Sequence, residues 1–128
     1  MASSISTSEA PAALGPYSQA TLLPAGARIL YVSGQIPLQP NGALTSGTIE
    51  EETALCLSNA AAILKQAGTT LGNVIKATVF LTDINDFAAV NAEYERWFPG
   101  HVKPARSCVE VRNLPKGARV EVEVVAFV

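Results

Sequence analysis

Two stretches of helical periodicity constrain the fold of this chain most, because each has a single apolar side to bury. Thr48-Ile49-Glu50-Glu51 has the pattern of a capping box, so a helix is predicted from about Ile49 to Gly68. A second helix is predicted from Asp86 to Phe98, where Pro99-Gly100 ends it. Its buried side is aromatic but includes one polar residue, Asn91. Both helices therefore need a flat apolar surface on which to pack.

Strand-like segments before, between and after these helices supply such a surface. The segments are Tyr17 to Leu23, Arg28 to Val32, Val74 to Asp83, Ala105 to Arg112 and Arg119 to Val128. Short turns separate the first two segments and the last two, and the first of these turns predicts a hairpin. The order ββαβαββ predicts an α+β sandwich, in which one mixed sheet carries both helices on one face. The other face of the sheet must then be covered from outside the chain.

Composition favours an oligomer built from one small domain. The length of 128 residues suits a single folded unit, residues 10–128, preceded by a flexible tip at residues 1–9. Only 16% of the residues are charged and 48% are hydrophobic, so some surface is expected to be buried between copies. Met1 to Ala10 has no Lys or Arg, which predicts a loose end and not a secretion or transit peptide. We expect a cytoplasmic protein, with an organelle matrix as the alternative.

Charge and residue counts disfavour several functional classes. The chain has nine Lys and Arg against eleven Asp and Glu, without a long basic run, which disfavours nucleic acid as a partner. Cys56, Cys108 and His101 are too few ligands for structural zinc. The two cysteines permit one disulfide, but two reduced thiols are expected. No apolar run is long enough to span a membrane.

Arg106 is the strongest candidate for ligand binding from the residues alone. The strand period of two places Arg106 and Cys108 on one side of their strand, and Glu121 and Glu123 on one side of the last strand. If these strands form a hairpin, all four residues share one sheet face. Arg106 could hold a small carboxylate with its planar guanidinium, or form a surface ion pair with Glu121 or Glu123. Glu121 could position a water or simply face solvent.

Three further residues have both a functional and a structural interpretation. Cys108 could be a nucleophile if its pKa were lowered, but the only candidate base is the loop residue His101, so a Cys/His pair is disfavoured. Tyr17 follows Gly15-Pro16 and is either a pocket hydroxyl or a half-buried aromatic. Asn91 needs a partner for its amide and can hold a backbone group or a ligand. The residues alone thus predict a small α+β oligomer with a candidate carboxylate-binding arginine.

Six segments, in order and over nearly the whole chain, resemble the Rid family, also called YjgF. They are APAALGPYSQ (10–19), VSGQIP (32–37), KATVFL (76–81), Asp86-Phe87 with Asn91 and Tyr94, PARSCVE (104–110) and LPKGARVEVE (114–123). The resemblance is to the RidA branch, the 2-iminobutanoate/2-iminopropanoate deaminases. It implies a chorismate-mutase-like fold, assembled as a homotrimer around a barrel, with active sites between subunits.

The implied reaction is the hydrolysis of reactive 2-imino or enamine acids to 2-oxo acids and ammonia. No metal or organic cofactor is implied, because an iminium carbon is already electrophilic. The family's carboxylate-binding arginine falls on Arg106, its cysteine beside the ligand on Cys108, and its water-directing glutamate on Glu121. Cys108 is not expected to act as a nucleophile. The family's pocket tyrosine, cleft glycine and pocket asparagine fall on Tyr17, Gly34 and Asn91.

Other functions stay open at this point. Some members of the family are described as ribonucleases or translation inhibitors, and a trimer of this kind could also be a non-catalytic ligand-binding module or a chaperone. The acidic charge balance speaks against RNA. The short connection from Phe98 to Pro104 and the pair Arg112-Asn113 depart from many relatives. These departures leave the size of the substrate open.

Overall fold

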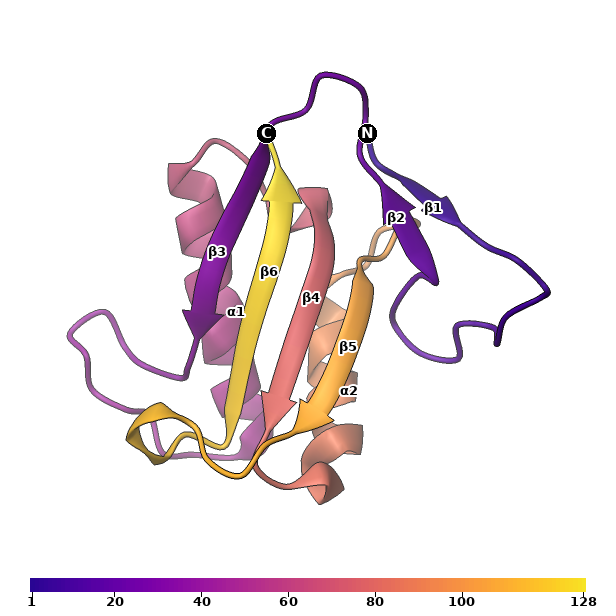
Figure 1. Cartoon of the computed structure of the whole chain (residues 1–128). Helices are drawn as coiled ribbons and strands as arrows, with labels where there is room; N and C mark the ends of the chain where they lie inside the picture. The colour runs from indigo at the N-terminus through magenta and orange to yellow at the C-terminus, as the bar shows by residue number, and fades with distance from the viewer.

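Four strands form one mixed sheet in the order β3-β6-β4-β5, with two helices behind it in Figure 1. The computed structural model describes the whole chain, residues 1–128. The strands of the sheet are β3 (Ile29–Gln35), β4 (Val74–Leu81), β5 (Ala105–Glu110) and β6 (Val120–Phe127). A separate two-stranded sheet consists of β1 (Ser3–Ile5) and β2 (Ala20–Leu22). The predicted α+β class is confirmed.

Both predicted helices are present, and both cover the same face of the sheet (Figure 1). α1 spans Ile49–Gln66 and α2 spans Phe87–Trp97. The Glu51 amide donates a hydrogen bond of 3.1 Å to the Thr48 hydroxyl, as the capping box predicts. Neither helix combines the length and hydropathy that crossing a membrane requires. Three short 3-10 turns lie between the larger elements, at Leu71–Asn73, Ile84–Asp86 and Pro115–Gly117.

The core lies between the helices and the sheet. Alternate residues of β4 and β6 are buried there, as period-two strands predict. Cys56 is also fully buried on α1, and burial raises the pKa of its thiol to about 12, so Cys56 is a packing residue. Both cysteines are free thiols. The main buried residues are Thr53, Leu57, Ala60, Leu64, Ala77, Val79, Leu81, Val90, Tyr94, Val120, Val122, Val124 and Ala126.

The predicted hairpin of the first two segments is wrong, and the last two segments do not form a hairpin either. β2 pairs with β1, whereas β3 pairs with β6. β5 lies parallel to β4, and β6 pairs with the other edge of β4 in the antiparallel sense. The reason is the crossover through α2, since a helix between two strands returns the chain to the starting end and makes the strands parallel neighbours. A turn signal marks a change of direction but does not select the neighbouring strand.

The N-terminal segment contains a short strand. Residues 3–5 form β1 and pair with β2 in an antiparallel register. Gln19 ties down the loop between these strands, because its side-chain oxygen accepts from the Thr7 amide at 2.7 Å and its nitrogen donates to the Pro11 carbonyl at 2.7 Å. One side-chain amide thus supplies partners that the backbone of this segment lacks, and the flexibility of residues 1–9 stays a prediction.

The sheet face opposite the helices has no cover within the chain, and we call it the open face. Tyr31 of β3 is 75% exposed and Val109 of β5 is 42% exposed. A monomer would leave these large apolar groups in water, which is the arrangement expected of an interface. From the strand register, the open face includes Tyr31, Lys76, Thr78, Phe80, Ser107, Val109, Glu121, Glu123 and Val125.

Candidate functional site

Arg106 lies on the edge strand β5 with its side chain on the helix face of the sheet. Its direct partner in the parallel register is Ala77, which is fully buried in the core. The guanidinium reaches α2, where Nη1 donates a hydrogen bond of 2.7 Å to Oδ1 of Asn91. The amide that interrupts the aromatic stripe of α2 is therefore used to hold the arginine.

Three aromatic rings surround the guanidinium of Arg106. Its central carbon lies 4.8 Å from the ring centroid of Tyr94, 5.5 Å from that of Tyr17 and 5.9 Å from that of Phe87. Phe87, Asn91 and Tyr94 follow one another at spacings of four and three residues, so they share one side of α2. An aromatic ring attracts a cation through its face and does not occupy the N–H donors, which lie in the plane of the guanidinium. The other N–H groups of Arg106 thus stay available.

Tyr17 is far from Arg106 in the sequence but is fixed beside it. The next residue, Ser18, donates hydrogen bonds to the carbonyl oxygens of Lys103–Pro104, at 2.6 Å from its hydroxyl and 3.1 Å from its amide. Gly15 supplies the space. A Cβ there would lie 3.3 Å from the Tyr17 ring and 3.7 Å from Nη2 of Arg106. The segment before β2 therefore forms one wall of the arginine site.

No carboxylate pairs with Arg106 within the chain. The two ion pairs of the structure involve other arginines, Arg96 and Arg119. The predicted alternative, a surface ion pair between Arg106 and Glu121 or Glu123, is wrong because these residues lie on opposite faces of the sheet. A half-buried guanidinium without an acidic partner is suited to bind an anion, and its planar donors match a carboxylate.

Cys108 lies two residues beyond Arg106 on the same side of β5, opposite the buried Val79. Burial raises the pKa of its thiol, and the nearby charge of Arg106 only partly opposes this effect. The thiol is therefore protonated at neutral pH, which does not suit a nucleophile. His101 is exposed in its loop, and no hydrogen bond joins it to Cys108. The structure gives no basis for a Cys/His pair.

Glu121 lies on the open face, against the backbone of Gly34. A Cβ at Gly34 would clash with the carboxyl group of Glu121, so a side chain there would displace this carboxylate. Burial is the main cause that raises the pKa of Glu121, and the negative charge of Glu123 adds to it. A carboxyl with a raised pKa is better suited to exchange protons near neutral pH than an ordinary surface glutamate.

The predicted sharing of one sheet face by Arg106, Cys108, Glu121 and Glu123 is wrong. β4 separates the two strands, and the register places Arg106 and Cys108 beside core residues, whereas Glu121 pairs with Phe80 of the open face. The chain therefore carries two groups of candidate residues. The Arg106 cluster consists of Tyr17, Asn91, Arg106 and Cys108, and the Glu121 pair consists of Glu121 and Gly34.

The sequence interpretation missed three members of the arginine site, namely Gly15, Phe87 and Tyr94. Phe87 and Tyr94 were assigned to the apolar stripe of the helix, and their spacing around Asn91 is the signal that could have identified them. Gly15 gave no signal, because its role depends on the distant β5. No group of three or more His, Cys, Asp or Glu side chains is placed to hold a metal ion.

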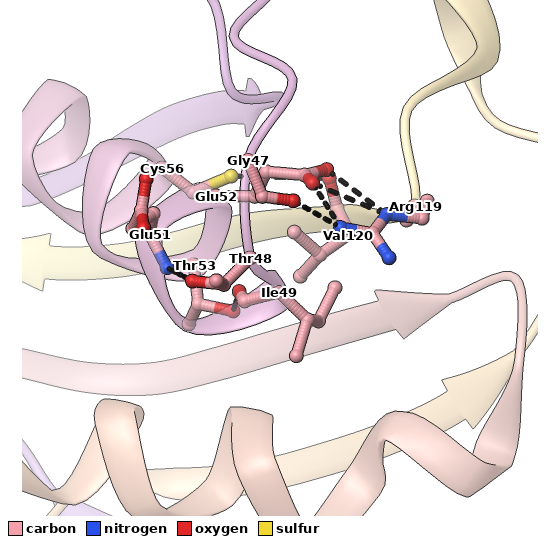
Figure 2. A network of polar contacts seen from close by, with 9 residues as sticks. All are labelled: Gly47, Thr48, Ile49, Glu51, Glu52, Thr53, Cys56, Arg119 and Val120. Atoms are coloured by element: carbon pink, nitrogen blue, oxygen red, sulfur yellow. Dashed lines mark hydrogen bonds and ion pairs between the residues drawn. The ribbon is translucent and has the colours of Figure 1, made fainter.

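A second polar network joins the start of α1 to the start of β6 (Figure 2). The buried carboxylate of Glu52 pairs with Arg119, whose Nε lies 3.1 Å from Oε2. Arg119 also donates to the Gly47 carbonyl at 2.8 Å. Because Arg119 comes two residues before Glu121, this network fixes the beginning of the strand that carries Glu121.

Comparison with known proteins identifies the family. The sequence profile of the family described as Endoribonuclease L-PSP matches residues 7–128. The chain belongs to this family. The chain is also 50% identical over 124 residues to the human 2-iminobutanoate/2-iminopropanoate deaminase, which covers 96% of this chain and 88% of that protein. The protein of the same name from Salmonella typhimurium is 44% identical, and the match covers 98% of both chains.

Solved structures share the fold of this family member. The Rid family protein YyfA from Yersinia pestis is 50% identical, with a TM-score of 0.76 and full coverage of both chains, 100% each. The TdcF protein of E. coli, solved with bound serine, is 41% identical, with a TM-score of 0.73 and 97% coverage of both chains. The resemblance to the Rid family is thus confirmed in sequence and in structure.

Proposed function

We propose that this chain hydrolyses reactive 2-imino acids, among them 2-iminobutanoate and 2-iminopropanoate, to 2-oxo acids and ammonia. The observation that carries the proposal is the Arg106 cluster, in which a guanidinium without an acidic partner is fixed by Asn91 and aromatic rings. Such a group is suited to a small carboxylate. The names of relatives at 44–50% identity and the serine bound to TdcF agree with a small substrate of the amino-acid type.

The proposal includes a homotrimer with active sites between subunits. Within one chain, Arg106 and Glu121 lie on opposite faces of the sheet and cannot reach one substrate. A second copy that covers the open face would bring the Glu121 pair of one subunit to the Arg106 cluster of the next. The exposed Tyr31 and Val109 support this arrangement, because they need such a cover.

In the proposed reaction, Arg106 holds the substrate carboxylate and Glu121 of the neighbouring subunit positions a water. The water oxygen bonds to the carbon of the protonated imine, the C=N π electrons move to the nitrogen, and the Glu121 carboxylate takes one proton of the water, which gives a neutral carbinolamine. Glu121 then returns that proton to the nitrogen. The C–N bond breaks, ammonia leaves with the electron pair, and the hydroxyl oxygen forms the ketone and releases its proton to solvent. The rate enhancement comes from placement and electrostatics.

The other residues of the cluster have supporting roles in this proposal. Tyr17 and Asn91 wall and orient the carboxylate site, and Gly34 leaves room for the Glu121 carboxylate. Cys108 contributes its bulk and a protonated thiol beside the ligand. The reaction as written needs no organic cofactor, because the substrate carbon is electrophilic. A cytoplasmic or organelle-matrix location remains a prediction.

The test is a coupled assay in which a threonine dehydratase generates the imine, semicarbazide competes for it, and 2-oxobutanoate formation is followed. The wild-type protein should accelerate oxo-acid release. Arg106→Ala should remove nearly all of this acceleration, because one charge-assisted bidentate contact is lost, and Arg106→Lys should restore only part of it. Arg28→Ala, which removes an exposed positive charge elsewhere, is the matched control and should keep full activity.

A ribonuclease is the second candidate, because the family profile carries the description Endoribonuclease. The net charge of −2 and the presence of only one histidine, the exposed His101, speak against it. No acceleration by the wild type with imines from threonine, alanine or leucine would overturn the deaminase proposal. RNA cleavage with a steep dependence on salt, or a holding activity that survives Arg106→Ala, would then identify the alternative.

A further inference from the structure

Tyr94 is the largest fully buried side chain of the protein, and its hydroxyl has no hydrogen-bond partner. A buried hydroxyl without a partner is unfavourable, and a phenylalanine would avoid this penalty. Burial also raises the pKa of the Tyr94 phenol, so the group stays neutral. The hydroxyl therefore does not explain what this residue does in the chain, and its ring must be considered.

The Tyr94 ring lies between helix α2 and the guanidinium of Arg106. It stacks on Phe98, with 4.6 Å between ring centroids and an interplanar angle of 31°. Of the three rings around Arg106, that of Tyr94 is the nearest, at 4.8 Å, and it alone is fully buried. The core thus reaches the arginine through a stack of two rings, and Tyr94 is its last member.

Arg106 needs such a support because its charge is half-buried and unpaired. An acidic partner would stabilise the guanidinium, but it would also occupy the donors that a substrate carboxylate requires. Asn91 accepts from Nη1 only. An aromatic face offsets part of the desolvation of the cation and leaves the in-plane N–H groups free.

We propose that Tyr94 is a positioning residue, whose ring, and not its hydroxyl, holds Arg106 in the orientation that receives the substrate carboxylate. The reference to a substrate rests on the deaminase function proposed above. The position of the guanidinium itself does not depend on that function. Because the carboxylate is bound in both the ground state and the transition state, weaker positioning raises KM more than it lowers kcat.

Isosteric variants test the ring without emptying the core. Tyr94→Phe removes only the unpartnered hydroxyl and should keep KM within about twofold of the wild type. Replacing that phenylalanine by 4-fluoro- and then 3,4,5-trifluorophenylalanine weakens the electrostatic attraction of the ring at nearly constant volume. KM should then rise stepwise, by about two- to thirtyfold in total, at nearly constant kcat. Val90→Ala, a change at another buried residue of α2 that removes no aromatic ring, should leave KM unchanged.

A second measurement needs no activity. The Arg106 side-chain Nε–H signal, assigned in ¹⁵N-labelled protein with the help of Arg106→Lys, should carry an upfield ring-current shift. Tyr94→Phe should keep this shift, and Tyr94→Leu should lose most of it. If Tyr94→Leu does not fold, 2-oxobutanoate is titrated into the wild type and the fluorinated variants instead. The change of the same Arg106 signal then gives the affinity of each protein for this carboxylate.

Two results would overturn the inference. One is an unshifted Arg106 signal in the wild type, which would show that the ring does not lie against the guanidinium. The other is a Tyr94→Phe variant with the KM increase expected of the trifluorinated protein, which would assign the role to the hydroxyl. A shifted signal in a protein without deaminase activity would instead support the positioning role and refute the proposed function.

Discussion

At the residue scale, Gly34 and Glu121 form the tightest steric contact of the candidate residues. The carboxylate of Glu121 occupies the space that any Cβ at position 34 would fill. The glycine is thus required for a close approach and not for an unusual backbone angle. The same partial burial raises the pKa of Glu121, so position and protonation of the carboxyl have one physical cause.

Gly34→Ala should therefore change both the rate and the pH dependence of the proposed reaction. The displaced carboxylate no longer positions water, and kcat should fall about ten- to hundredfold. Burial raises the pKa of Glu121, so moving the group into solvent should lower it, and the acid limb of the kcat profile should shift to lower pH.

Gly100→Ala is the control for this prediction, because no atom lies within 4 Å of a Cβ there and its backbone angle is ordinary. Its pH profile should match that of the wild type. A Gly34→Ala enzyme with unchanged kcat and an unchanged acid limb would contradict the assignment of Glu121 as the proton acceptor.

At the scale of elements, the ion pair of Glu52 and Arg119 connects α1 to β6 (Figure 2). Glu52 is almost fully buried, whereas the Arg119 side chain is 44% exposed. Removing the arginine would leave a buried charge without a partner, which costs more than the pair itself contributes. The network therefore matters chiefly because Arg119 keeps the buried charge of Glu52 paired at the contact of α1 with β6.

Arg119→Ala should lower the free energy of unfolding by about 1–3 kcal/mol, less than the ~3–5 kcal/mol for a fully buried pair, because Arg119 is half-exposed. Arg96→Ala is the matched control, since its side chain is 77% exposed in the pair with Glu93, and it should cost at most about 1 kcal/mol. Urea denaturation at fixed protein concentration measures both. Equal losses in the two variants would contradict the structural role of the Glu52 network.

At the scale of the whole molecule, the two sheet faces have different partners. The helix face forms the core of one chain, with Val122 fully buried, whereas the open face exposes Val109. The proposed trimer uses the open face, and it explains why a chain with 16% charged residues can present Tyr31 and Val109 outside its own core.

Charged substitutions should separate these two faces. Val109→Asp should dissociate the oligomer into folded monomers, because it places like charges in the contact between copies. Val122→Asp should instead unfold the chain, since the charge has no partner in the core. Analytical ultracentrifugation together with circular dichroism distinguishes the outcomes. A trimeric Val109→Asp protein would refute the open face as the interface, and a stable Val122→Asp protein would refute the assignment of the faces.

The sequence by itself determined the elements of this protein. The capping box at Thr48, the apolar stripes of α1 and α2, and the alternation in β4 and β6 are local patterns, because a helix or strand repeats within a few residues. Residue chemistry identified single positions such as Arg106. The six segments that resemble the Rid family predicted the reaction.

Only the tertiary structure decided which elements lie side by side and therefore which residues meet. β4 between β5 and β6 places Arg106 and Glu121 on opposite faces, where a hairpin would have joined them. The ring of Tyr94 beneath Arg106 and the contact of Gly34 with Glu121 likewise join distant segments. Local turn chemistry carries no information on strand neighbours, because the choice depends on the helix crossover and on the packing of the whole sheet.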